Sequence, residues 1–295
     1  MSFNRIAIHG HRGLFSSTIT AALIASGAPV TILYRPGSET SNIPAGTRTI
    51  EVDPNDEDAL VAALQDIDIV ISLVGVKGVP NEFGFVKAIP RTEVKLFVPS
   101  DLGLRYGEEG MKIPLLRMKE DVQEGARRAG IPVMGIDVKG NRLCYTGNAA
   151  KEKVGMCTAD YVAAAYVSLF TKSPISEVSN RAIGLVELAP TGEEVAAALE
   201  KKHGKPPAIF HQPVEDTVAT FNEYLNAESD AKYLAPAWFY RKIWGTGEIT
   251  TMLGQDIYHV PDYQKATLEE LVVEGKVKPY RDLSKYNDFW EMMYR

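Results

Sequence analysis

A buried strand that runs through a glycine-containing turn into a helix opens this chain, and it limits the possible folds more than any other feature. Residues 5–10, RIAIHG, form a short apolar run of strand type. Residues 16–27, SSTITAALIASG, carry apolar residues three and four positions apart and end at a glycine, as helices commonly do. A strand and a helix joined by GHRG predict the first unit of an α/β fold.

The same alternation continues to about residue 138. Strands that read as apolar on both faces are typical of a parallel sheet that is covered by helices on both sides. We therefore predict an α/β protein in which residues 1–138 form a Rossmann domain, a doubly wound parallel sheet. The expected strands are residues 5–10, 29–35, 47–53, 68–75, 94–100 and 132–138, and the expected helices are residues 16–27, 56–67 and 117–130.

The second half of the chain, residues 139–295, has a different pattern, and we expect it to form a smaller α/β lobe that binds the substrate. Helices are expected at 159–171, which should pack on the Rossmann domain, and at 192–203. Residues from 214 onward read as polar and aromatic pieces without a clear period. Their aromatic side chains fit a pocket over the carboxyl ends of the strands or, alternatively, packing that only joins the lobe to the sheet.

Composition narrows the functional classes. Apolar residues make up 45% of the chain and charged residues 24%, as in an ordinary globular protein. A net charge of −6 without a basic block argues against nucleic acid or an anionic membrane as partner. No apolar stretch reaches membrane-spanning length and no signal-peptide pattern is seen, so we expect a cytoplasmic protein. Two cysteines and five scattered histidines predict neither a disulfide framework nor a metal site.

The turn after the first strand has the spacing of a dinucleotide-binding motif. Gly10, Gly13 and Ser16 follow the pattern GxxGxxG, with serine in place of the third glycine. Gly10 would allow a sharp turn, and Gly13 would allow close approach of a diphosphate to the N–H groups of the following helix. Leu14 and Phe15 complete the predicted phosphate loop. An ordinary strand–helix turn is the alternative, and the ends of the other strands favour the nucleotide site.

Two arginines predict which dinucleotide binds. The second strand ends in TILYRPGS, so Arg35 and Ser38 stand where an NAD-binding fold places an acidic residue. Arg35 and Arg12 could both bind a 2′-phosphate, which favours NADPH as the cofactor. Asp53, at the end of the third strand, is expected to meet the adenine amino group. Further contacts are expected at the ends of the fourth and fifth strands, from Val74, Gly75, Pro99 and Ser100.

Taken in order, these motifs resemble a known family. The segments GHRGLFSSTITAALIASGAPVTILYRPGS, VDPNDEDALVAALQDIDIVISLVG, VKLFVPSDLG and ARRAGIPV are similar to those of the NmrA-like and isoflavone-reductase-like branch of the atypical short-chain dehydrogenases. The resemblance covers roughly residues 4–138. It implies an NADP-binding Rossmann domain, a small substrate lobe, and a catalytic lysine early in the helix before the sixth strand, at Lys119.

The resemblance also implies a task for Lys119, which would handle the proton that accompanies hydride transfer to a substrate carbon. Desolvation beside an apolar pocket would suit a lysine to this task, whereas a solvated place on a charged helix is the alternative. Asp101, Tyr106 and Trp238 are expected to contact the substrate. The stretch after residue 138 is shorter than in the reductases of the family, so one wall of their pocket is expected to be missing.

Three functions fit these residues. We favour an NADPH-dependent reductase of a small apolar or aromatic metabolite, which could form a homodimer. A shortened pocket wall would also fit an NmrA-like regulator that binds dinucleotide without turning it over. A third alternative is an isomerase or cyclase that keeps the coenzyme as a structural element.

Overall fold

The computed structural model describes residues 3–13, 15–100, 104, 106–123, 136–137, 141–228 and 234–276. Its main sheet has five parallel strands in the order β3-β2-β1-β4-β5. The chain starts in the middle of the sheet and reverses direction beside β1, so the sheet is doubly wound and the predicted Rossmann fold is confirmed. The strands are β1 (Ile6–His9), β2 (Val30–Tyr34), β3 (Arg48–Glu51), β4 (Ile69–Ser72) and β5 (Leu96–Val98).

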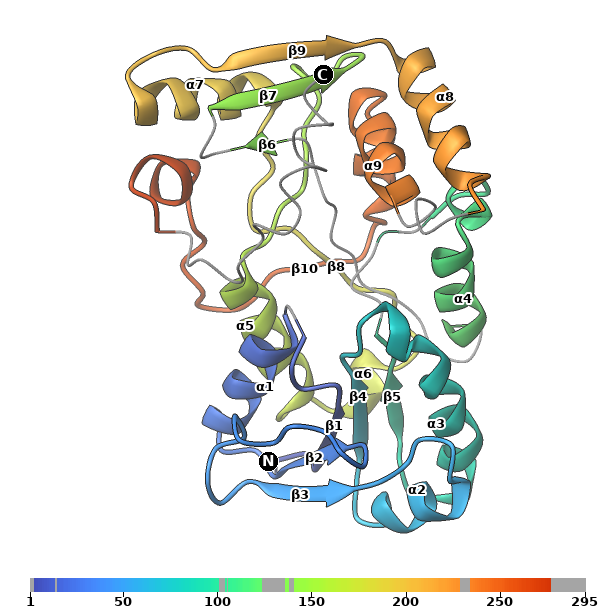
Figure 1. Ribbon diagram of the computed structural model, residues 1–295. Helices are drawn as coiled ribbons and strands as arrows, with labels where there is room; N and C mark the ends of the chain where they lie inside the picture. The colour runs from blue at the N-terminus through green and yellow to red at the C-terminus, as the bar shows by residue number, and fades with distance from the viewer. Residues whose placement is uncertain are drawn as a thin grey trace.

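Helices cover both faces of this sheet (Figure 1). Ile6 and Ile8 of β1 pack against α1 and α5 on one face, whereas Ala7 belongs to the core that α2 and α3 form on the other. Because central strands are buried on both sides, they read as continuous apolar runs. The four helices are α1 (Ser16–Ala25), α5 (Ala159–Phe170), α2 (Glu57–Ala63) and α3 (Glu82–Ala88).

The edge strand β3 does not follow the pattern expected of a buried strand. Of its four residues, Arg48–Glu51, only Ile50 is half-buried and the others are exposed. Among the described strands, it pairs with β2 alone. An edge strand has one neighbour, so charged side chains are tolerated there and also discourage pairing with other chains.

A second, three-stranded sheet lies at the other end of the molecule in Figure 1. Its order is β6-β7-β9, with β6 (Ile136–Asp137) antiparallel to β7 (Arg142–Thr146) and β7 parallel to β9 (Ala208–Gln212). Helices α7 (Gly192–His203) and α9 (Ala235–Gly245) contribute to a separate apolar core here. The other elements are η1 (Val76–Asn81), η2 (Ile89–Arg91), η3 (Gly110–Lys112), α4 (Pro114–Gln123), α6 (Ile175–Val178), β8 (Gly184–Leu185), α8 (Val214–Leu225), α10 (Glu248–Met252), β10 (Ile257–Tyr258) and the π-helical turn η5 (Glu269–Val273).

Two expectations about secondary structure need correction. The run 132–138 was expected as a sixth parallel strand, but its described part, β6, pairs antiparallel with β7 in the second sheet. A regular helix, α8, forms at Val214–Leu225, where irregular polar and aromatic pieces are expected. Its apolar residues Val214, Val218, Phe221 and Leu225 recur three and four positions apart, so the sequence does carry a helical period here. For β6, tertiary packing decides the outcome, because a short apolar run carries little local preference.

The aromatic residues of α9 fill the second core. Trp238, Phe239, Tyr240 and Trp244, all from α9, are at most 6% exposed. For these four side chains, aromatic packing is the observed role. Among the described helices, none combines the length and the apolar composition that crossing a bilayer requires.

Candidate functional site

The turn between β1 and α1 is packed tightly against the end of β4. Gly10 has a φ of +92°, and a Cβ at this position would lie 2.7 Å from the backbone N of Val74. The N–H of Leu73 donates to the carbonyl of His9 at 2.7 Å, which continues the ladder between the two strands into the turn. Both the positive φ and the close approach require glycine, as the motif predicts.

Ser16, at the place of the third glycine, fixes the start of α1. Its hydroxyl donates to the carbonyl of Leu73 at 2.7 Å, and Gly13 lies directly against the Ser16 side chain. In the described part of the chain, α1 has no acidic residue in its first turn, and Phe15 at its N-cap makes no side-chain capping bond. The positive end of α1 is therefore suited to an anion.

Both arginines of the predicted phosphate site lie at this edge and are exposed. Arg35 follows β2 in a turn closed by the N–H of Ser38, which donates to the Arg35 carbonyl at 3.0 Å. Arg12 lies in the β1–α1 turn. One acid comes nearby, since hydrogen bonds from Ser41 and Thr40 and, less strongly, the Arg12 charge lower the pKa of Glu39. No acid follows β2 directly, but the loop after this strand places the Glu39 carboxylate where the Arg12 charge acts on it.

Two histidines lie beneath the turn, and the sequence pattern assigns them no role. His9 is 4% exposed, and its ring centroid lies 5.0 Å from that of Phe85. Burial and then the Arg35 charge lower the pKa of His9 to about 4, so the imidazole is neutral at physiological pH. Burial and the Arg12 charge also lower the pKa of His11, which is 5% exposed. The lowered pKa values favour neutral imidazoles, which add no positive charge beside Arg12 and Arg35.

The ends of β4 and β5 are joined by Ser100. Its hydroxyl donates to the carbonyl of Val74 at 2.6 Å, and its N–H donates to the carboxylate of Glu82 at 2.7 Å. Glu82 is 1% exposed, so it is a buried support for this strand end that the sequence does not reveal. Pro99 is buried, whereas Gly75 is exposed and has open space where a Cβ would be.

Asp53, expected at the adenine, lies at the exposed end of β3. One of its carboxylate oxygens accepts from the N–H of Asn55 at 2.9 Å and from the side-chain amide of Asn55 at 3.0 Å. This turn leads to Asp56, which caps α2 through the N–H of Ala59. The adenine role of Asp53 stays a prediction.

Lys119 lies on α4, half-buried, and α4 contacts both η1 and α3. The structure therefore brings the lysine-bearing helix beside the segment that continues from the end of β4. Two residues expected in the site, Leu14 in the phosphate loop and Asp101 in the substrate pocket, lie outside the described residues.

The two other expected substrate contacts are buried in the second core. Tyr106 is 7% exposed and its hydroxyl lies 2.8 Å from that of Tyr240. Trp238 is 5% exposed, stacks on Tyr224 at 6.2 Å, and has the Arg241 guanidinium 4.6 Å from its ring. A substrate role for either residue stays a prediction.

Helix α9 holds the segment that leads into α4. The Lys242 amine donates to Glu109 at 2.8 Å and to Glu248 at 2.7 Å, with the lysine side chain 15% exposed. Phe239 packs 3.0 Å from the position that a Cβ on Gly110 would take. Together with the Tyr106–Tyr240 contact, these interactions hold residues 106–110, which precede α4, against α9 of the second core.

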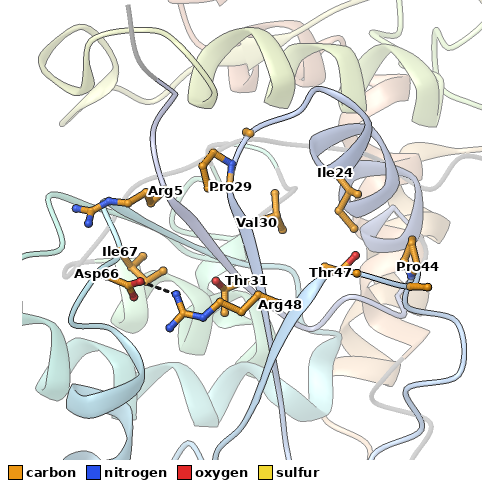
Figure 2. Close-up of a pocket in the computed structure, with 13 residues that line it drawn as sticks. Arg5, Ile24, Pro29, Val30, Thr31, Pro44, Thr47, Arg48, Asp66 and Ile67 are labelled. Carbon is orange, nitrogen blue, oxygen red and sulfur yellow. Dashed lines mark hydrogen bonds and ion pairs between the residues drawn. The ribbon is translucent and has the colours of Figure 1, made fainter.

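A cavity of about 450 Å³ lies at the opposite edge of the main sheet (Figure 2). Arg48 points toward Asp66 across it, with an ion-pair distance of 2.5 Å. Nearby, Arg5 and Lys95 each lie 2.9 Å from Asp68. Open α/β sheets bind ligands at the carboxyl ends of their strands, so this cavity at the amino ends is not the coenzyme site.

A larger cavity of about 830 Å³ adjoins the starts of α1 and α5. Glu187 closes part of it by accepting from the N–H groups of Thr158 at 2.6 Å and Ala266 at 2.9 Å. Phe15 of the predicted phosphate loop lines this cavity, whereas Lys119 does not. The lining also includes Ser17, Met156, Thr158, Tyr263 and Leu271.

Comparison with known proteins agrees with this geometry. Residues 2–137 match the model of the NmrA-like family. This match covers slightly less than half of the chain. The resemblance found in the sequence is confirmed, and it extends over the strands and turns that form the candidate site.

The curated proteins that this chain resembles are plant reductases. Isoflavone reductase of Medicago sativa is 27% identical over 243 residues, which cover 68% of this chain and 76% of the relative. Pinoresinol reductase 1 of Arabidopsis thaliana is 27% identical, covering 60% of this chain and 56% of its own length. For a maize isoflavone reductase homologue, the match spans 46% of the relative.

Solved structures share the whole fold. The leucoanthocyanidin reductase–NADPH complex of Vitis vinifera aligns with a TM-score of 0.74 at 19% identity, covering 93% of this chain and 100% of that one. AtPrR2 with NADP+ and (+)-pinoresinol aligns with a TM-score of 0.75 at 17% identity, covering 93% of this chain and 99% of that one. At these identities, the likeness establishes the fold.

Proposed function

We propose that this protein is an NADPH-dependent reductase of a small apolar or aromatic metabolite. One observation carries the proposal: two exposed arginines flank the positive end of α1 at the carboxyl edge of the sheet, and no acid follows β2 directly. Its relatives are reductases of isoflavones and pinoresinol, which supports the reaction type and an aromatic substrate class. In this proposal residues 1–138 bind the coenzyme and residues 139–295 mainly bind the substrate. The cytoplasmic location also remains a prediction.

The described residues fit NADPH at this edge. Gly10 and Gly13 let the turn approach a diphosphate, whose charge the N–H groups of α1 meet. Arg12 and Arg35 bind the 2′-phosphate with charge-assisted hydrogen bonds. Neutral His9 keeps the floor of the turn uncharged. When bound, NADPH supplies the hydride.

Lys119 supplies the matching proton in this proposal. Its ammonium group would donate a proton to the substrate atom on which reduction leaves an electron pair. The amine is then protonated again from solvent. Helix α9 supports this role, because its contacts with Glu109 and Gly110 hold the chain that leads into α4.

Turnover by the full chain tests the lysine role. NADPH oxidation would be followed by its near-ultraviolet absorbance with isoflavone, pinoresinol and leucoanthocyanidin compounds as substrates. Lys119→Met should lower kcat at least about 100-fold while NADPH affinity stays unchanged. Lys112→Met, which changes an exposed lysine on η3, is the matched control and should keep full activity. Equal turnover by both variants would remove Lys119 from the mechanism.

Coenzyme choice tests the arginine site. Arg35→Ala should weaken NADPH binding about tenfold or more and leave NADH binding nearly unchanged, since only NADPH carries the 2′-phosphate. A wild-type protein that binds both coenzymes equally would contradict the phosphate assignment. An NmrA-like regulator would instead bind NADPH without consuming it with any compound of the panel, and dinucleotide would change its affinity for a protein partner.

A further inference from the structure

Strand β9 is the outer strand of the second sheet. Among the described strands, the order β6-β7-β9 gives it a single neighbour, and Figure 1 shows it along the rim of the molecule with no labelled element beyond it. Ile209 is 42% exposed and is one of two large apolar side chains found exposed among the described residues. An accessible edge strand with an exposed apolar side chain is a template for pairing with another strand.

The backbone of β9 presents two residues to the open side. The N–H of Ala208 donates to the carbonyl of Asn141, and the carbonyl of Gln212 accepts from the N–H of Gly147. In a parallel ladder, alternate residues face the same neighbour, so residues 208, 210 and 212 bond to β7. Ile209 and His211 therefore direct their N–H and C=O groups outward, and within the described residues no partner is recorded for them.

We propose that β9 pairs antiparallel with β9 of a second copy of this chain, around a two-fold axis at Phe210. Ile209 of each copy then lies opposite His211 of the other, and each such pair exchanges both of its backbone hydrogen bonds. Every outward backbone group of the two residues is satisfied. Phe210, which is half-buried against the second core, faces Phe210 of the other copy and extends that core across the axis.

The residues around β9 favour this register over others. Pro207 and Pro213 stand three positions on either side of Phe210, so the axis places proline opposite proline where pairing ends. A slip by two residues would set an outward C=O against a proline, which has no N–H to give. The symmetric register is therefore the one that uses all outward groups.

Charges around β9 favour a second copy as the partner. Lys205 and Glu215 stand five positions on either side of Phe210 and are both exposed. Within the described residues neither has a recorded ion pair. An antiparallel pairing brings Lys205 of each copy toward Glu215 of the other, which is the self-complementary pattern of a two-fold interface.

Sedimentation velocity on the full chain tests the interface. Wild type should show a reversible monomer–dimer equilibrium, and Lys205→Glu or Glu215→Lys should each weaken dimerisation about tenfold, because both symmetric contacts become repulsive. An equimolar mixture of the two single variants should dimerise like wild type, since their heterodimer regains both opposite-charge pairs. The double variant with both Lys205→Glu and Glu215→Lys should also dimerise like wild type, because each contact again joins opposite charges. A wild-type monomer at the highest soluble concentration, or a dimer insensitive to these changes, would overturn the proposal.

Cysteine cross-linking tests the register. Phe210→Cys should form an intermolecular disulfide under mild oxidation, because directly opposed residues of a non-hydrogen-bonded pair have Cα atoms about 4.5 Å apart. Ile209→Cys is the matched control: it is more exposed, yet its copies are offset by two residues and should not cross-link. The reverse result would refute the register. NADPH binding should be unchanged in every variant, because β9 lies at the other end of the molecule from β1 to β5 (Figure 1), so this proposal fails or succeeds independently of the reductase assignment.

Discussion

Lowering the pH should destabilise the protein through the buried imidazole of His9. Burial and the Arg35 charge lower its pKa from 6.5 to about 4 in the folded chain. The unfolded chain therefore takes up a proton at a higher pH than the folded chain does. Stability from this residue is complete above pH 6.5, declines as the pH falls, and is fully lost near pH 4.

The size of the effect follows from the two pKa values. A gap of about 2.5 units, at about 1.4 kcal/mol for each unit, gives about 3 kcal/mol in total. About 2 kcal/mol of this should already be lost at about pH 5, where the unfolded imidazole is almost fully protonated. His11, whose pKa is also lowered by burial, adds to the loss with the same sign.

Urea unfolding followed by circular dichroism at several pH values between about 7 and about 5 measures this slope. His9→Leu removes the titrating group while keeping an apolar contact with Phe85, so its free energy of unfolding should depend less on pH. His259→Leu, at an exposed position, is the matched control and should keep the wild-type slope. If the His9 variant lost as much stability with acid as wild type, a buried neutral imidazole at this position would be refuted.

Three further changes test other contacts. Gly10→Ala should cost at least about 2 kcal/mol of unfolding free energy and abolish NADPH binding, because the alanine Cβ would press on the backbone of Val74. Urea unfolding and coenzyme titration measure these two effects. Asp68→Asn should cost about 2 kcal/mol of unfolding free energy near neutral pH and little in strong acid. Hydrogen bonds from Arg5 and Lys95 lower the pKa of the Asp68 carboxyl, so the stabilisation it gives is present above the ordinary carboxyl pKa and is lost as the pH falls below it. Lys242→Met should cost about 1 kcal/mol and increase amide hydrogen exchange around Glu109, while an unchanged exchange pattern would argue against a clamp by α9.

Local patterns could predict the main sheet and its turns. β1 and β4 are buried on both faces, so their sequences are apolar throughout, and the Gly10 turn needs a residue type that only glycine supplies. The helix at 192–203 agrees residue for residue with α7, because Thr191 and Glu194 form a capping box and Gly204 ends the helix in the left-handed conformation.

Other features depend on contacts between distant residues and leave no local pattern. The partner of β6 is set by the position of β7, and nothing in the run 132–138 distinguishes the two sheets. Glu82 supports Ser100 from a different element, 18 residues away in sequence. Trp238 illustrates a third case, because a large aromatic residue has the same appearance in a sequence whether it lines a pocket or fills a core.

The two halves of the candidate site differ in how they are held. The phosphate turn is fixed by contacts within the main sheet: Gly10 lies against Val74, and the Ser16 hydroxyl donates to the carbonyl of Leu73. Such a turn is preorganised, so little ordering entropy opposes coenzyme binding. The approach to Lys119 is held instead by α9, from a different core, through Lys242 and Glu109. Helix α4 itself also contacts η1 and α3, so the lysine helix is held from both cores, and the position of Lys119 depends on how the two cores pack against each other, whereas the phosphate turn does not.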